Sequence, residues 1–469
     1  MFSTLAIIIT LLLLMFFAYR GYSVLILAPI MAVVAVLLSG DFLSSIPAYT
    51  DVFMSALSGF LLKFFPIFLL GALFGRLIAD SGAATAIANT VVDKLGCNKA
   101  ILAVILVCAI LTYGGVSLFV VAFAIYPIAK NLFKAADVPK RLIPAAIALG
   151  SFTFTMTALP GTPAIQNAIP IPYYNTNVFA APILGTIGAL IMFFAGWYWL
   201  QSRANKARLA GEGYGEHDDD LEQKEDIDHS QTTSDHQISF VTAMIPLVLV
   251  ISLNALLTYV VFPGLDFSSL QAQYPDLNIQ GSLGLWSIII ALLVACTVLV
   301  ILRIGHWHNL KSSINRGTYE SMLPIFNTAS EVGYGAVIAS LAGFIIIRDS
   351  ILNLTPDNPL ISEAVAMTTL AGITGSSSGG LSIALSTLGE NYYQMALATG
   401  IDPELMHRVA VMAAGGLDTL PHSGAVITLL AICGLTHKQS YLNIAMVTML
   451  IPLVATTTII ILGTLLGSF

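Results

Sequence analysis

Long apolar runs with almost no charge dominate this sequence and decide its fold class. A run of about 18–25 apolar residues suits an α-helix that crosses about 30 Å of hydrocarbon. The 469 residues are 57% hydrophobic and only 10% charged, whereas soluble domains carry about 25% charged residues. The sequence therefore predicts an all-α polytopic membrane protein.

The first apolar run and the cysteines give two further expectations. Residues 2–18 lack a basic n-region and a small-residue cleavage site, so we expect a retained helix rather than a signal peptide. The four cysteines form no Cys-x-x-Cys pair and lie in or beside apolar runs. They indicate neither a disulfide framework nor a metal site.

An acidic, polar stretch at residues 201–237 divides the chain into two halves of similar length. It is too polar to bury a core, so it predicts a cytoplasmic linker. The first membrane repeat is expected at residues 1–200 and the second, inverted, at residues 238–469. Histidines lie among the carboxylates of the stretch and could bind a metal, but a solvated linker explains this composition better.

Basic residues predict the orientation in the membrane. If both termini lie outside, every Lys and Arg except Lys63, Arg348 and Arg408 falls on the cytoplasmic side. The opposite orientation would leave nearly all of them outside. In the second half, residues 321–347 are expected to form one span that runs outward. We therefore expect a multi-pass protein of a bacterial cytoplasmic (inner) membrane with external termini.

Short motifs recur in the same order at a nearly constant spacing. Thr-Tyr-Gly-Gly at residues 112–115 lines up with Thr-Gly-Ser-Ser at residues 374–377. Leu-Pro-Gly-Thr-Pro-Ala-Ile at residues 159–165 lines up with Leu-Pro-His-Ser-Gly-Ala-Val at residues 420–426. The copies have opposite predicted orientations, which indicates the inverted-topology repeats of secondary transporters.

Residues 415–428 place an acid, an imidazole and helix breakers inside an apolar segment. Asp418 at the centre of a membrane helix would cost about 2.5–3.5 kcal/mol. Pro421 and Gly424 interrupt a helix, and freed backbone groups are tolerated at membrane depth where they line a cavity. We therefore expect a broken helix that faces a solute site, with a surface loop as the alternative.

Each repeat is expected to supply one re-entrant hairpin and one broken helix to a common site. Small residues at the hairpin tips let backbone N–H groups reach a ligand, and half-helix N-termini favour an anion. The expected substrate is an organic anion, although Ser and Thr in membrane helices often bond only their own backbone. The candidate substrate-binding residues are Thr112, Gly114, Gly115, Ser117, Thr157, Gly161, Thr162, Ser376, Ser377, Ser378, Asp418, Thr419, His422 and Ser423.

His422 and Asp418 are the candidates for proton coupling. Histidine titrates near neutral pH, and the acid lies one helical turn before it in the sequence. A structural histidine is the alternative, and a sodium site made of unwound carbonyl groups stays open. Lys63 could oppose the charge of the substrate, pair with an acid or reach the membrane surface, and Glu331 is a further candidate relay.

No motif indicates an enzyme. The sequence contains no His-Glu-x-x-His, no phosphate-binding loop of an ATP-driven pump and no Gly-x-Ser-x-Gly. The Ser-rich break at residues 375–379 lacks the strand-turn-helix context of a nucleophile elbow. No cofactor and no nucleic-acid partner is predicted.

Several motifs together resemble a known family. They are Asp-Ser-Gly-Ala at residues 80–83, Ala-Ala-Asp-Val-Pro at 135–139, the Leu-Pro-Gly-Thr-Pro break, the Ser-rich hairpin and the run at 420–437. Across nearly its whole length the chain resembles the gluconate:proton symporter (GntP) family of the ion-transporter superfamily. It looks most similar to permeases for 3-hydroxybutyrate or short-chain carboxylates. The resemblance implies a scaffold domain that forms a homodimer and a transport domain that moves in an elevator manner.

Two motifs depart from the family's sugar-acid transporters. Those proteins carry a Tyr-Glu-Val-Gly tip and a His-Gly-Phe-Leu-Pro-Pro-His-Pro-Gly-Pro break. Here residues 113–116 read Tyr-Gly-Gly-Val, and residues 156–163 lack both histidines. Fewer polar groups suit a substrate with fewer hydroxyls, so we expect a proton symporter that imports a 3-hydroxybutyrate-like anion. The alternatives are a sugar-acid symporter, a sodium-coupled carboxylate transporter and a passive anion channel.

Overall fold

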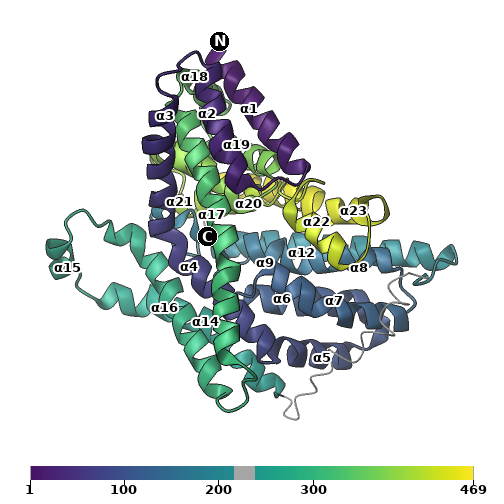
Figure 1. The fold of residues 1–469 in the computed structure, drawn as a ribbon. Coiled ribbons are helices and arrows are strands. Elements are labelled where there is room, and N and C mark those ends of the chain that lie inside the picture. The colour runs from purple at the N-terminus through teal and green to yellow at the C-terminus, as the bar shows by residue number, and fades with distance from the viewer. Residues whose placement is uncertain (1, 216–237, 468–469) are drawn as a thin grey trace.

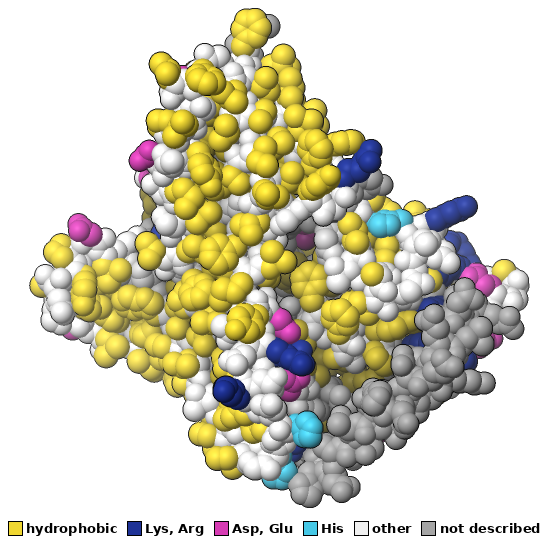
Figure 2. Space-filling view, in the orientation of Figure 1, with side chains coloured by type: hydrophobic (Ala, Val, Ile, Leu, Met, Phe, Trp, Pro, Cys, Tyr) yellow, Lys and Arg dark blue, Asp and Glu magenta, His cyan; other side chains and the backbone are white. Residues whose placement is uncertain are grey.

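The computed structural model describes residues 2–215 and 238–467, and all regular secondary structure in these two ranges is helical (Figure 1). Six helices there are long and apolar enough to cross a membrane, or up to eight spans if each of two bent helix pairs counts as one. Hydrophobic side chains gather over the upper part and the left of the face in Figure 2, and the charged side chains in view lie mostly in its lower middle and right. The predicted all-α, multi-pass membrane protein is confirmed.

The first half of the chain ends in a long helix that continues into the predicted linker. This helix, α12, reaches Leu209, and residues 216–237 of the linker lie outside the described residues. The helices before the linker are α1 (Phe2–Tyr19), α2 (Val24–Leu38), α3 (Ser45–Pro47), α4 (Met54–Asp80), α5 (Ala83–Leu95), α6 (Ala100–Tyr113), α7 (Leu118–Ala135), α8 (Ile143–Ser151), α9 (Phe154–Thr157), α10 (Ile165–Ala168), α11 (Ile171–Tyr174) and α12 (Pro182–Leu209).

The second half repeats much of this order. Its helices are α14 (Phe240–Leu256), α15 (Ser268–Gln273), α16 (Ile279–Leu302), α17 (Leu310–Ser340), α18 (Ala342–Leu352), α19 (Pro359–Thr374), α20 (Ser377–Thr399), α21 (Pro403–Ala414), α22 (Gly424–Ile432), α23 (His437–Ala445) and α24 (Ile451–Leu466). Helices α18, α19 and α20 each begin 259 residues after α5, α6 and α7, and α21 begins 260 residues after α8.

Contacts between helices follow the same correspondence. Helix α1 packs on α2 and α18, and in the other half α14 packs on α16 and α5. Likewise α2 packs on α17, and α16 packs on α4. Two pairs of corresponding helices, α4 with α17 and α12 with α24, lie directly against each other. Both halves therefore contribute to one helical body, with the two hairpins, α6–α7 and α19–α20, in matching positions.

The segment around residue 341 differs from the sequence-based expectation. The sequence predicts one outward span at residues 321–347, but α17 ends at Ser340 and the chain turns by 98° into α18. Leu341 has an extended backbone. Gly343 lies so close to α1 that an added Cβ would be 2.3 Å from the Thr4 nitrogen. The bend therefore lets α18 cross the start of α1.

Candidate functional site

Two hairpin tips are shaped by residues that leave the backbone accessible. In the first hairpin Gly114 follows α6, and Gly115 has a φ of +100°. In the second hairpin Gly375 has a φ of +65°, and Ser376 caps α20 by accepting a hydrogen bond from the Gly379 nitrogen. Glycine favours this left-handed region because it lacks a Cβ. Each tip thus turns sharply into a helix whose N-terminus faces the turn.

Two helix interruptions complete the set predicted from the sequence. The first separates α9 from α10 and includes Gly161, with a φ of +83°. The second separates α21 from α22, and within it the Ser423 nitrogen donates to the Leu420 carbonyl at 2.8 Å. The sequence places both breaks correctly, because Pro and Gly residues mark them.

The first tip, the first break and the second tip are connected by direct contacts. The Tyr113 hydroxyl donates to the Pro160 carbonyl at 2.8 Å. An added Cβ on Gly115 would lie 2.9 Å from Pro163. Beyond the break, the Gln166 amide donates to the Ser377 hydroxyl at 3.1 Å. The contacts run from the first half of the chain into the second half.

The second break contacts both the second tip and the first break. Ser377 interacts with the carboxyl group of Asp418. An added Cβ on Gly375 would lie 3.0 Å from the His422 ring and 3.2 Å from the Ser423 Cα. The two breaks also meet, because an added Cβ on Gly415 would lie 2.9 Å from the Thr157 methyl group. The structure therefore brings all four interruptions into one region.

Several buried polar atoms in this region have no hydrogen-bond partner. They are Thr112 Oγ1, Asp418 Oδ1, His422 Nε2 and Ser423 Oγ. Asp418 is 6% exposed and Ser423 only 1% exposed. Most buried polar groups in proteins are paired, so such atoms indicate a place for a ligand, water or ion. Their mixture of donors and acceptors suits a small molecule with carboxylate and hydroxyl groups.

Other predicted site residues have hydroxyls engaged within the protein. Thr157 donates to the Thr153 carbonyl, Thr162 accepts from the Ala164 nitrogen, and Thr419 pairs with Thr448 at 2.6 Å. The hydroxyls of Ser376 and Ser378 lie 3.3 Å apart. These groups shape the breaks and the second tip.

The first tip also contacts helices outside the hairpins. An added Cβ on Gly114 would overlap Leu247 of α14, only 2.0 Å away. Ser117 begins α7, and its backbone nitrogen would lie 3.3 Å from a Cβ on Gly75 of α4. The missing side chains of Gly114 and Gly75 thus allow the tip to pack closely on α14 and α4.

Arg408 is a functional candidate that the sequence reasoning missed. This residue of α21 is fully buried and makes no salt bridge with a carboxylate of the described residues. Its guanidinium donates to the carbonyls of Thr157, Val178 and Ala180 and to the side-chain oxygen of Asn167. These neutral acceptors satisfy its N–H groups, and the Glu404 carboxylate acts on the guanidinium from beyond ion-pair distance. The only sequence signal was an isolated Arg within an apolar segment.

Arg408 and Glu404 hold one peptide group from both ends. The Ala180 carbonyl accepts from Arg408 at 2.9 Å and 3.0 Å, and the Ala181 nitrogen donates to Glu404 at 3.2 Å. Ala181 has a φ of +43°, which is unusual for a residue with a Cβ. These hydrogen bonds fix the start of α12 to α21 in the second half of the chain.

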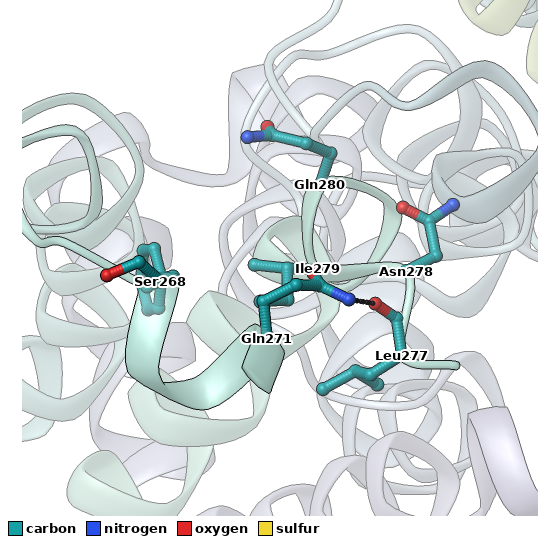
Figure 3. Close-up of a pocket in the computed structure, with 7 residues that line it drawn as sticks. Ser268, Gln271, Leu277, Asn278, Ile279 and Gln280 are labelled. Atoms are coloured by element: carbon teal, nitrogen blue, oxygen red, sulfur yellow. Dashed lines mark hydrogen bonds between the residues drawn. The ribbon is translucent and has the colours of Figure 1, made fainter. Parts of the chain in front are cut away.

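A buried polar chain leads from Arg408 to a cavity. Asn167 Oδ1 lies 3.2 Å from His407 Nε2, and His407 Nδ1 lies 2.6 Å from the Thr176 hydroxyl. Thr176 lines a cavity of about 410 Å³ between the α11–α12 connection and the start of α16. A neighbouring cavity of about 370 Å³ lies between α15 and α16, where Gln271 donates to the Leu277 carbonyl (Figure 3). Neither cavity is lined by a hairpin tip.

Lys63, the basic residue predicted within a span, lies near the second hairpin. Its ammonium group is 5.6 Å from the centre of the Tyr173 ring. An added Cβ on Gly389 of α20 would lie 3.0 Å from the same ring. The lysine thus faces an aromatic ring, and it forms no ion pair with an acid of the described residues.

Comparison with known proteins gives matches along nearly the whole chain. The sequence model of the GntP family permeases matches residues 1–462. An uncharacterized transporter of Bacillus subtilis (strain 168), YxjC, is 47% identical over 448 residues, which cover 93% of this chain and 94% of that protein. An uncharacterized transporter of Haemophilus influenzae is 34% identical over 125 residues, covering 26% of this chain and 29% of that protein.

A solved structure resembles the fold. It is that of MtrF from Neisseria gonorrhoeae, described as illuminating a class of antimetabolite efflux pumps. The match has a TM-score of 0.55 and 15% sequence identity, and it covers 91% of this chain and 85% of MtrF. At this level of identity the likeness concerns the fold alone.

Proposed function

Because this chain belongs to the GntP permease family, we propose that it imports a small organic hydroxycarboxylate, such as 3-hydroxybutyrate, together with a proton. It is a transporter and not an enzyme. The observation that carries the proposal is the meeting of two hairpin tips and two helix breaks around unpartnered buried polar atoms. Discontinuous helices that meet in this way form the substrate site in many secondary transporters.

The charge distribution supports an anionic substrate. Helices α7, α20 and α22 begin at the tips and at the second break, and each helix N-terminus carries partial positive charge. The guanidinium of Arg408 adds a full positive charge beside the first break, where it bonds the Thr157 carbonyl. Within a low-dielectric region this charge acts over a longer distance than it would in water.

The number of unpartnered groups supports a short substrate. A carboxylate can accept from backbone N–H groups of the tips, and one hydroxyl can bond Thr112 or Ser423. A sugar acid carries several more hydroxyls, each of which would need its own partner. A monohydroxylated anion therefore fits the available groups better than gluconate.

Asp418 and His422 are the proposed proton carriers. Asp418 interacts with Ser377, and His422 lies against Gly375, so both contact the second tip. Movement of this tip would change the surroundings of both groups and so their affinity for a proton. Proton and substrate binding would in this way depend on the same element.

The fold suggests which parts would move. The proposed transport domain contains the hairpins and broken helices of both repeats, and the proposed scaffold contains α1–α4 and α14–α17. The inverted arrangement would place the site near the membrane midplane and allow an elevator motion of one domain along the other. Dimerisation through the scaffold, in a bacterial cytoplasmic membrane, completes the proposal.

Uptake into proteoliposomes tests the function. With an imposed inward proton gradient and no other gradient, labelled 3-hydroxybutyrate should accumulate above its external concentration. Equilibration without accumulation would instead support a passive anion channel, and accumulation driven only by sodium would support sodium coupling. Competition by unlabelled 3-hydroxybutyrate, lactate, butyrate, gluconate and dicarboxylates then defines the substrate.

A further inference from the structure

Helices α17 and α20 pack side by side and run in the same direction along their contact. The hydroxyl of Thr328 lies 3.5 Å from that of Ser378. Three residues further along α17, Glu331 faces Gly379, the residue after Ser378. Beyond it, a Cβ on Gly335 would lie 2.9 Å from Ile383. The residue numbers rise together along both helices, so this contact is a continuous strip that begins at the second hairpin tip.

A buried acid lies in the middle of this strip. Glu331 is 3% exposed, and its Oε2 atom has no hydrogen-bond partner. Gly379 makes room for it, because an added Cβ there would lie 1.7 Å from that oxygen. No Lys, Arg or His of the described residues forms an ion pair with Glu331. An isolated ionised carboxylate in such a place is strongly unfavourable unless something neutralises it.

Two more unpartnered oxygens belong to the same strip. Asn327 precedes Glu331 by one turn of α17, and Ser382 follows Ser378 by one turn of α20, so each shares a helix face with a residue of the contact. Buried Asn327 Oδ1 and Ser382 Oγ have no hydrogen-bond partner. Ser382 is 1% exposed. The strip thus gathers a carboxylate, an amide oxygen and three hydroxyls, and its oxygens Asn327 Oδ1, Glu331 Oε2 and Ser382 Oγ have no hydrogen-bond partner.

We propose that this strip is a sodium site, with Asn327, Thr328, Glu331, Ser378 and Ser382 as its oxygen ligands. Hard cations prefer carboxylate, carbonyl and hydroxyl oxygens of this kind. A proton on Glu331 would satisfy a single oxygen and leave those of Asn327 and Ser382 unpartnered. A coordinated cation satisfies the whole set and neutralises the acid.

The site adds a second ion to the transport cycle, and this consequence rests on the proposed function. Its ligands come from α17 in the proposed scaffold and α20 in the proposed transport domain. Bound sodium would therefore hold the second hairpin against the scaffold in this state. Release of the ion would free α20 to slide, leaving the protonation of Asp418 and His422 as a separate step.

Sodium binding to the purified full-length protein tests the proposal without substrate. Binding of radioactive ²²Na⁺ is measured with choline chloride keeping the ionic strength constant, and thermal unfolding is followed in sodium, potassium and choline salts. We expect saturable binding of one sodium ion per chain and stabilisation by sodium over choline. Glu331→Gln should weaken binding at least tenfold. The matched control Glu320→Gln, on the same helix but paired with Arg76 at the surface, should bind like wild type.

Ser382→Ala provides a second variant if Glu331→Gln does not fold, because it removes one ligand oxygen with little change in size. It too should weaken sodium binding. Absence of saturable binding to wild type, or unchanged affinity in either folded variant, would overturn the site, as would stabilisation by protons alone. Substrate uptake is measured in parallel. Sodium binding without uptake would refute the proposed function and support the sodium site. Uptake without sodium binding would refute the sodium site and support the proposed function.

Discussion

Gln166 of the first broken helix donates a 3.1 Å hydrogen bond to Ser377 at the second hairpin tip, across 211 residues of sequence. Both side chains are buried. Ser377 in turn interacts with Asp418, so this amide links a break in the first half of the chain to a tip and a break in the second half. The bond is therefore a sensitive point at which to test whether the four interruptions act as one site.

Gln166→Leu should weaken substrate binding. Loss of the donor leaves the buried Ser377 hydroxyl without this partner, which costs about 1–3 kcal/mol. We expect KM for uptake to rise roughly tenfold, since about 1.4 kcal/mol corresponds to a factor of ten. This KM is measured from initial uptake rates in proteoliposomes. Gln394→Leu, at an exposed position of α20, is the control and should match wild type. An unchanged KM in both variants would show that Gln166 does not contribute to substrate binding.

His422→Ala should uncouple transport from the proton gradient. The imidazole lies against Gly375, and its removal takes away a titratable group at the second tip. Concentrative uptake should be lost, whereas counterflow of labelled against unlabelled substrate should persist because binding and movement remain. His308→Ala, in an exposed loop, should keep both activities. Concentrative uptake that survives in His422→Ala would refute the proton role of this residue.

The sequence predicted the interrupted elements better than the groups that hold them together. Gly114, Gly375 and Pro421 mark the tips and the second break, because glycine and proline have specific backbone requirements. Arg408 was missed because its partners are mainly main-chain carbonyls more than 200 residues away. No pattern of side chains reveals which carbonyls a folded chain will leave free.

The bend at Leu341 was missed for a related reason. Neither glycine nor proline stands at the break, and the apolar run continues through it. The bend depends instead on how α18 packs over Ser3 and Thr4, where Gly343 makes close backbone contact. Such packing is decided by tertiary structure, which local sequence does not encode.

Arg408→Lys should destabilise the protein and abolish uptake. A guanidinium offers five N–H donors in a planar fork, and a lysine offers three on a single nitrogen. Arg408 donates to four acceptors, the carbonyls of Thr157, Val178 and Ala180 and the side-chain oxygen of Asn167, so at least one of them would lose this donor. We expect a loss of about 2–4 kcal/mol in unfolding free energy, because an unsatisfied buried group costs about 1–3 kcal/mol. Thermal unfolding in detergent measures whether the variant unfolds at a lower temperature than wild type.

The matched control for that substitution is Arg348→Lys, whose side chain lies at the surface beside Asp349. It should leave the free energy of unfolding within about 0.5 kcal/mol of wild type. If Arg408→Lys were equally neutral, the hydrogen bonds of Arg408 would not hold the first break in place.

Gly380→Ala should separate the two helices of the second hairpin. An added Cβ would lie 2.2 Å from the Ala371 nitrogen, and a backbone atom cannot move aside as a side chain can. Overpacking of this kind costs about 1–3 kcal/mol. Uptake should fall together with the unfolding temperature. Gly71→Ala in α4, where nothing lies within 4 Å, should show neither loss. Equal activity of both variants would mean that the α19–α20 spacing is not critical.

The Arg141–Glu212 pair predicts a small pH dependence of stability. Arg141 donates to both carboxylate oxygens at 2.6 Å and 2.8 Å, and this hydrogen bonding lowers the pKa of Glu212. A lowered folded-state pKa means that the pair stabilises the protein above the pKa of the unfolded chain. That stabilisation is lost as the pH falls through the folded-state pKa. Because Glu212 is 43% exposed, the contribution is about 0–1 kcal/mol.

Glu212→Gln should therefore be slightly less stable than wild type near pH 7, and the two should converge in acid. Thermal unfolding between pH 7 and pH 3 measures the difference, and about 1 M salt should reduce it by screening the charges. Glu390→Gln removes an exposed carboxylate that accepts a hydrogen bond from Gln394 on the same helix, and it serves as the control. A difference that grows toward acid would contradict the pairing, because protonation of Glu212 abolishes the charge on which it depends.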